Sequence, residues 1–400
     1  MTAVTWARAN LFRDRRDAIT TVVAGAVVGW VVFRLLRFAI VTGRWDVVRD
    51  NLSLFLVGRY PVDDQWRVVV ALVAIAGVAG LVAGQIAGRR RRAAEAAGER
   101  LEHPGPAARI VEVVARDWPI LGLVLLLLLL ARTASPWLVA LATIGAALLG
   151  RLVGALVPPA IGRAVFVLPV VLPIVLLPFL TGPLGWDSWG GLMLTLLLAS
   201  ISMIACFPLG MLLALGRRSS FPALRAVSVG VVEFFRGVPL VVLVLMSDVA
   251  LGFFFPRDLL PGKVVRVMVA FTIFTAAYVA EIIRGGLQSV PRGQTEAAQA
   301  IGLSPVRVTG FIVLPQALRN VIPALVGQFI SLFKDTTLVF IIGFLEVLTV
   351  ADAVTKQPGY RGQGLITETL VFAALLFWVG SYTLSRESQR LERRLGVGHR

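Results

Sequence analysis

Residues 294–315 read QTEAAQAIGLSPVRVTGFIVLP, and they form the one long polar interruption in the very apolar second half of the chain. The stretch predicts two short helices joined by a corner. Gly302 can end the first helix, because glycine adopts the left-handed backbone conformation without steric cost. Ser304 and Pro305 are typical of an N-cap and a first helical position, and Pro315 is expected to end the second helix. At the mouth of a membrane bundle, such an elbow predicts a docking element through which a partner drives transport.

The composition indicates that most of the chain lies in a membrane. Apolar residues make up 57% of the 400 residues and charged residues only 16%, and the mean hydropathy is +0.83. Soluble domains carry about 25% charged residues. The formal net charge of +16 is carried mostly by arginines in short segments beside apolar runs. That arrangement is typical of membrane topology signals rather than of a nucleic-acid-binding face, so we expect a lipid membrane and no nucleic acid as partner.

Apolar runs of about 20 residues predict membrane-spanning helices, and the fold class is therefore expected to be all-α and polytopic, with about ten transmembrane helices. The expected spans are residues 18–41, 67–88, 117–132, 137–157, 163–181, 190–216, 227–250, 264–284, 320–345 and 364–386. Arg13, Arg15 and Arg16 precede the first span, and no small-residue cleavage site follows a short apolar core. A retained first helix is therefore expected rather than a removed signal peptide.

The distribution of basic residues predicts the orientation. With both termini in the cytoplasm, the inner segments carry 24 of the arginines and lysines near the spans and the outer segments carry 8. Cytoplasmic loops of membrane proteins carry such an excess. Residues 294–315 are therefore expected to face the cytoplasm.

The two halves of the chain differ in character. Residues 1–189 hold five spans rich in Leu, Val and Ala, whereas residues 190–390 hold five spans with polar and charged residues at depth. We interpret the first half as an N-terminal extension that serves as scaffold, the second as the functional domain, and residues 391–400 as a cytoplasmic tail. No internal repeat is apparent, so the sequence gives no support to an inverted-repeat secondary transporter.

Residues suited to catalysis or to metal binding are scarce. Cys206 is the single cysteine and lies in an apolar run, and the two histidines, His103 and His399, lie far apart in polar segments. Neither a thiolate metal site nor a catalytic constellation can be built from them. The sequence also lacks the Gly-x-x-x-x-Gly-Lys-Ser/Thr loop that cradles nucleotide phosphates. We expect a chain that is not an enzyme and that carries no cofactor or metal of its own.

An ordered series of motifs between residues 190 and 390 resembles the permeases of ATP-binding-cassette (ABC) importers. In the elbow, the resemblance to their cytoplasmic coupling loop is carried by Glu296, Ala297, Ala298, Gly302, Leu314 and Pro315. Residues 235–240, 277–286, 289–294, 314–319 and 332–338 are similar to the polar amino-acid branch, which includes histidine, glutamine and general L-amino-acid permeases. The five-span extension resembles the longer permease subunit of general L-amino-acid systems.

The resemblance implies a type I importer domain over residues 190–390, with residues 285–319 as its coupling loop. It implies an amino-acid permease subunit of a bacterial inner membrane that works by alternating access. The implied partners are a second, related permease subunit, two cytoplasmic subunits that bind ATP and Mg, and a periplasmic amino-acid-binding protein. An ion-coupled secondary amino-acid carrier is the alternative, and an intramembrane enzyme ranks below it.

Charged residues within the spans are candidates for the substrate pathway. Lys334 and Asp335 lie about 14 to 15 residues beyond Asn320, which corresponds to a depth of roughly 20 Å at 1.5 Å per residue. Ionisable residues at that depth normally face the bundle interior, where they would meet either the substrate or charges on other helices. Asp248 is expected in the outer part of its span, where it would meet cationic substrates or solvent. The pathway candidates are Lys334, Asp335, Thr336, Thr337 and Asp248.

Two pairs of opposite charge occur at a spacing of three residues, Glu233 with Arg236 and Glu281 with Arg284. Residues three apart share one face of a helix and can form a weakly stabilising ion pair. Both pairs are expected near the cytoplasmic side. There we expect them to anchor the gate region rather than to touch the transported molecule.

Overall fold

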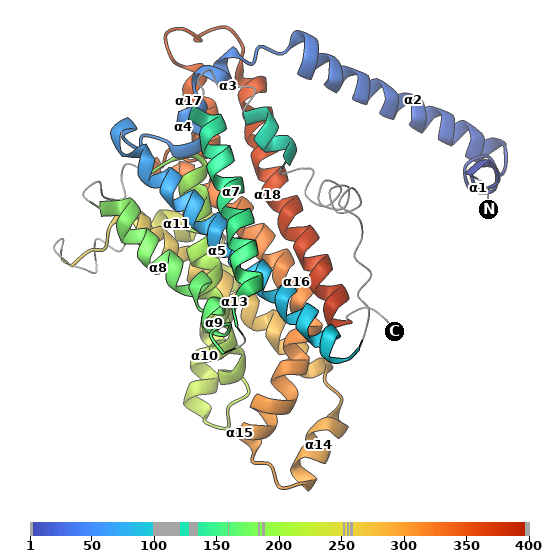
Figure 1. Ribbon diagram of the computed structural model, residues 1–400, viewed down its shortest axis with the longest axis vertical. Helices are drawn as coiled ribbons and strands as arrows, with labels where there is room; N and C mark the ends of the chain where they lie inside the picture. The colour runs from blue at the N-terminus through green and yellow to red at the C-terminus, as the bar shows by residue number, and fades with distance from the viewer. Residues whose placement is uncertain are drawn as a thin grey trace. The chain divides into compact units, whose positions relative to one another are not determined.

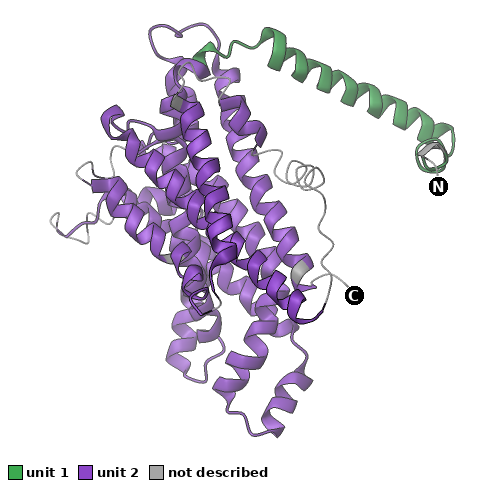
Figure 2. Cartoon of the chain, in the orientation of Figure 1, with its two compact units in different colours: residues 1–47 green, residues 48–400 purple. Residues whose placement is uncertain are grey.

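The computed structural model describes residues 3–98, 121–127, 135–158, 160–182, 185, 189–250, 253, 256 and 259–396. Regular structure in these residues is helical, apart from one bridge between Gly191 and Glu346, which confirms the all-α expectation. Both histidines, His103 and His399, and most of the expected span 117–132 lie outside the described residues. The chain divides into two units, Met1–Val47 and Val48–Arg400 (Figure 2).

The first unit consists of helix α1 (Ala3–Asn10), helix α2 (Arg15–Arg37) and the π-helix η1 (Phe38–Thr42). Asp14 caps α2, because its Oδ1 accepts a hydrogen bond of 2.9 Å from the backbone N–H of Asp17. Arg15–Thr42 is long and apolar enough to cross a membrane, which confirms the expected span 18–41. No residue of α2 is buried within the unit, so its apolar side chains are available to lipid or to a partner.

The second unit begins with the rest of the N-terminal extension. Its elements are α3 (Asp46–Asp50), α4 (Leu52–Val57), η2 (Val62–Asp64), α5 (Gln65–Ala96), α7 (Ser135–Leu156), η3 (Ala164–Phe166) and α8 (Leu168–Thr181). Helices α5 and α7 lie side by side (Figure 1). Glycines allow this close approach: a Cβ atom on Gly84 would lie 2.0 Å from the carbonyl oxygen of Arg151, and one on Gly150 would lie 2.2 Å from that of Gly77. Small residues are typical of closely packed helices in membranes.

The remaining elements form the functional domain. They are α9 (Gly191–Gly216), α10 (Pro222–Gly237), α11 (Leu240–Val249), α13 (Lys263–Ser289), α14 (Arg292–Ala300), α15 (Pro305–Arg307), η5 (Val308–Val313), α16 (Leu314–Asp335), η6 (Thr336–Ile342), α17 (Val347–Thr355) and α18 (Ile366–Leu395). Helix α13 is central, because it packs against both α9 and α16. One buried cluster includes Leu198, Phe271 and Leu332. A second, nearer the elbow, includes Ile283 and Ala317.

Seven helical runs in the described residues are long and apolar enough to cross a membrane, and an eighth is added if α10 and α11 form one broken span. The expected span 227–250 corresponds to α10 and α11, which do not form one straight helix, because the two meet at 102°. Proline explains the bend: Pro239 has no N–H to donate and forces the preceding residue into extended backbone. Val238 accordingly has φ −94° and ψ 133°.

Other boundaries also differ from the expectation. Helix α8 has only 14 residues, or about 21 Å at 1.5 Å per residue, which is less than the roughly 30 Å of a hydrocarbon core. The expected span 320–345 begins earlier, within a continuous helical run from Pro305 to Ile342. Helix α18 extends to Leu395, so the first part of the expected tail is still helical.

Candidate functional site

The elbow folds as two helical segments joined at Gly302. Helix α14 ends at Ala300, and the corner closes through hydrogen bonds from the N–H of Gly302 to the carbonyl of Gln299 at 2.9 Å and from that of Leu303 to Ala298 at 3.2 Å. Gly302 has φ +83°, and no atom lies within 4 Å of the place where its Cβ would be. Glycine is therefore required for the left-handed backbone and not for space. This confirms the expectation that a left-handed Gly302 ends the first helix of the elbow.

Two local expectations for the elbow have opposite outcomes. Ser304 occupies the N-cap position and Pro305 the first helical position, as expected, although the side chain of Ser304 makes no capping hydrogen bond. Pro315 does not end a helix: the chain continues through the π-helix η5 into α16, of which Pro315 is the second residue. Proline has no N–H to donate, and it follows a π-helix, where the hydrogen-bond register of the run changes. Glu296 lies in the second turn of α14, because the helix begins at Arg292.

The elbow has one packed face and one open face. Ala298, Val308 and Val313 are buried against the domain. Glu296, Ala297, Gly302 and Pro315 are exposed, and Leu314 is half-buried. Three large apolar side chains are also open, with exposed fractions of 78% for Ile301, 83% for Val306 and 74% for Phe311. Exposed apolar side chains concentrated on one short element are typical of an interaction surface.

The elbow is tied to the long helices behind it. The Nε2 of Gln316 in α16 donates to the Oε1 of Gln294 in α14 at 3.3 Å. The Nδ2 of Asn320 donates to the Oγ of Ser289, at the end of α13, at 3.0 Å. Helices α13 and α16 cross closely at Gly286, where a Cβ would lie 2.8 Å from the carbonyl oxygen of Ala317. These contacts connect the elbow directly to α13 and α16.

Beside the elbow, five charged side chains from α10, α13 and the residue that follows α9 form one group, the inner ionic cluster. Glu281 of α13 is its centre: its carboxylate lies 3.0 Å from Nη1 of Arg217, 3.7 Å from Nη1 of Arg236 and 2.9 Å from Nε of Arg284. Glu233 of α10 lies 3.2 Å from Nη2 of Arg217. Arg236 also lies over the ring of Tyr278, 5.6 Å from its centroid. The cluster joins the adjacent ends of α9, α10 and α13.

The cluster corrects one expected pair and confirms the contact of the other. Glu281 and Arg284 do pair across one helix face. In the described residues, Glu233 pairs with Arg217 of another helix rather than with Arg236, because Arg236 turns toward Glu281 and Tyr278. Sequence reasoning missed Arg217, since a spacing rule detects only partners within one helix.

Lys334, Asp335, Thr336 and Thr337 lie together where α16 changes into the 3₁₀-helix η6. The hydroxyl of Thr336 donates to the carbonyl of Phe333 at 2.7 Å, and that of Thr337 donates to the carbonyl of Lys334 at 2.9 Å. Lys334 is exposed and Asp335 half-buried. No ion pair in the described part of the chain links either charge to another helix, and contact with substrate stays a prediction.

Asp248, the remaining pathway candidate, is part of an outer group of charges. Its carboxylate lies 3.0 Å from Nζ of Lys263 and 3.3 Å from Nη2 of Arg266. Arg266 also donates to the carbonyls of Ser247 and Asp248, at 3.1 and 2.6 Å. The carboxylate of Asp248 is thus already balanced by two cations of this chain.

Comparison with known proteins identifies the family. Residues 206–397 match the family of binding-protein-dependent transport system inner membrane components. The glutamate/glutamine/aspartate/asparagine transport system permease protein BztC of Rhodobacter capsulatus is 33% identical over 100% of this chain and 95% of its own length. The inner membrane amino-acid ABC transporter permease protein YhdY of Escherichia coli is 46% identical over 53% of this chain and 57% of its own length. The probable glutamine ABC transporter permease protein GlnP of Bacillus subtilis is 36% identical over 51% of this chain and 91% of its own length. The chain is a multi-pass membrane protein that belongs to the family of binding-protein-dependent transport system inner membrane components.

Proposed function

We propose that this chain is the membrane-spanning permease subunit of an ABC importer that moves polar or general L-amino acids into the cell by alternating access. The observation that carries the proposal is the elbow at Gly302, with its exposed apolar side chains and its continuous connection to the long helical run Pro305–Ile342. The relatives named above are amino-acid permeases, which supports the substrate class. Neither the fold nor the relatives support an ion-coupled carrier.

The proposed complex contains a second, related permease subunit, two cytoplasmic ATP-binding subunits and a periplasmic amino-acid-binding protein. ATP and Mg would be bound by the partner subunits, because the sequence contains no phosphate-binding loop. The chain would lie in the inner membrane with both termini in the cytoplasm, as the distribution of its basic residues favours. Closure of the ATP-binding subunits would push on residues 285–319 and so reorient α13 and α16.

The test of this proposal is uptake of a labelled amino acid by cells that produce the complete complex. Gly302→Asp places a side chain on a left-handed backbone, and Glu296→Lys reverses an exposed charge on the elbow. Both changes should abolish uptake while the chain remains in the membrane at normal levels. Gly359→Asp is the matched control, because Gly359 has open space around it and an ordinary φ. Normal uptake with both elbow variants, or uptake that persists after ATP depletion, contradicts the proposal.

A further inference from the structure

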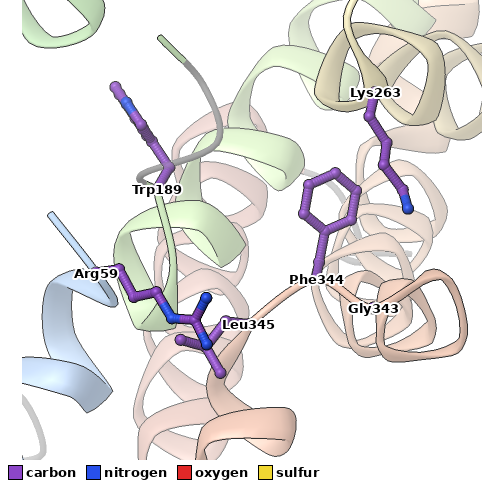
Figure 3. Close-up of a pocket in the computed structure, with 6 residues that line it drawn as sticks. All are labelled: Arg59, Trp189, Lys263, Gly343, Phe344 and Leu345. Carbon is purple, nitrogen blue, oxygen red and sulfur yellow. The ribbon is translucent and has the colours of Figure 1, made fainter. Parts of the chain in front are cut away.

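A pocket of about 160 Å³ lies at the end of the functional domain that is opposite the elbow. It is lined by Arg59, Trp189, Lys263, Gly343, Phe344 and Leu345 (Figure 3). Lys263 begins α13 and Gly343 follows η6, and both helical runs have their other ends at the elbow. Arg59 comes from the N-terminal extension, between α4 and η2. The pocket is therefore built jointly by the extension and the functional domain, on the predicted outer side.

Close backbone packing fixes the position of Arg59. Its neighbour Gly58 has φ +64°, and a Cβ atom there would lie 2.3 Å from the Cα of Gly190. A Cβ atom on Gly190 would lie 2.8 Å from the carbonyl oxygen of Leu345, and the N–H of Gly191 donates to that same oxygen at 2.7 Å. Three chain segments thus meet with backbone against backbone, directly beside the pocket. The extension presents Arg59 from a fixed position.

The pocket has an excess of positive charge. Lys263 pairs with Asp248, donates to the carbonyl of Ile342 and lies over the ring of Phe344, 5.6 Å from its centroid. Asp248 is shared with Arg266. Arg59 is exposed, and no ion pair or hydrogen bond joins its guanidinium to another side chain in the described part of the chain. Lys263 and Arg266 thus share one carboxylate, and Arg59 adds a further cation to the lining.

We propose that this pocket binds the carboxylate of a free amino acid on the outer side of the membrane, with Arg59 as its main ligand. A guanidinium matches a carboxylate through two parallel hydrogen bonds, and Lys263 adds positive charge from the opposite wall. Phe344, which lies beside Lys263 in the lining, provides apolar contact for the rest of the molecule (Figure 3). Pockets for drug-sized ligands hold about 300–1,000 Å³, so this pocket of about 160 Å³ suits a smaller ligand that enters it by its carboxylate end. The choice of an amino acid rests on the proposed function.

The test is calorimetric titration of the purified full-length chain, in lipid nanodiscs, with L-glutamate and with L-lysine. The wild-type chain should bind glutamate more tightly than lysine, because the excess of cations repels an additional ammonium group. Arg59→Gln should weaken glutamate binding by about tenfold or more, as expected for loss of a charge-assisted pair of hydrogen bonds. Arg49→Gln is the matched control: Arg49 is an exposed arginine on the same outer segment but does not line the pocket. The control should bind glutamate like the wild type, and all variants should keep the wild-type Tm.

Equal glutamate affinity of Arg59→Gln and Arg49→Gln overturns the inference, and so does equal binding of lysine and glutamate by the wild type. If the isolated chain binds neither and Arg59 affects only uptake that depends on the binding protein, the pocket contacts that protein and the inference is also wrong. The titration contains no ATP-binding subunit. Its failure is therefore separate from failure of the proposed docking role of the elbow.

Discussion

The exposed apolar side chains at the corner of the elbow allow a quantitative prediction for Val306→Ala. Val306 is 83% exposed, so nearly all of its side chain is available to be buried by a partner. Full burial of a Val, Leu, Ile or Phe side chain contributes about 1.5–3 kcal/mol, and one methylene contributes about 0.8 kcal/mol. Val306→Ala removes two such carbons and should weaken docking of the ATP-binding subunits by about 1.5 kcal/mol, roughly tenfold in Kd. Ile301→Ala should cost slightly more, because Ile301 is the larger side chain and is 78% exposed.

The assay is the concentration of purified ATP-binding subunit needed to saturate the permease in nanodiscs. Val62→Ala is the matched control, since Val62 is 80% exposed but precedes α5 in the segment predicted to lie outside. The Tm of each variant should equal that of the wild type, because both valines make few contacts within the chain. If Val306→Ala and Val62→Ala bind the subunit equally well, the corner of the elbow is not the docking surface and the reasoning is refuted.

Three further changes test the interior of the domain. Glu281→Gln removes the centre of the inner ionic cluster and leaves its arginines with one carboxylate. This loss should lower the free energy of unfolding by about 1–2 kcal/mol and the Tm by several degrees. An unchanged Tm contradicts the prediction. Lys334→Ala should reduce uptake severalfold without weakening capture of the ATP-binding subunits, whereas loss of assembly would indicate a structural role. Burial raises the pKa of Glu346 above its ordinary value of 4.5. The contribution of Glu346 to stability should therefore be fully present at pH below 4.5 and be lost as pH rises through the raised pKa. Glu346→Gln should remove this part of the pH dependence of Tm, and a variant with the same pH dependence as the wild type would contradict the prediction.

The spans were predictable because a bilayer imposes a long apolar run, and composition alone reveals such a run. The expected span 137–157 matches α7, and 190–216 matches α9. The break between α10 and α11 was missed, although Arg236 and Pro239 interrupt the apolar residues there and the proline itself indicates a break. Gly302 was predicted correctly because a left-handed corner has a strong residue preference.

The charged contacts were less predictable, because their partners lie far apart in sequence. The i, i+3 rule found Glu281 with Arg284 but gave no means of placing Arg217 beside both glutamates. Glu346 is a local case, because its partners lie only two and three residues away. Its carboxylate accepts hydrogen bonds of 2.7 Å from the N–H groups of Leu348 and Thr349 and so caps α17. Residue type gave no signal for this cap, because the preferred N-cap residues are Ser, Thr, Asp and Asn rather than Glu.

The same helical run connects the elbow with the outer pocket, and this continuity bears on how the two ends communicate. From Pro305 to Ile342 the chain is helical without interruption, a path on the order of 55 Å at 1.5 Å per residue. Gly343, Phe344 and Leu345, which line the pocket, follow immediately. The run is not uniform, because a π-helix lies near its elbow end and a 3₁₀-helix at its outer end. Such departures from α-helical geometry are where a helix changes its winding most readily. A push at the elbow would therefore reach the pocket as movement of the loop that carries Phe344 and Leu345, while Arg59 is presented by the extension on the other wall.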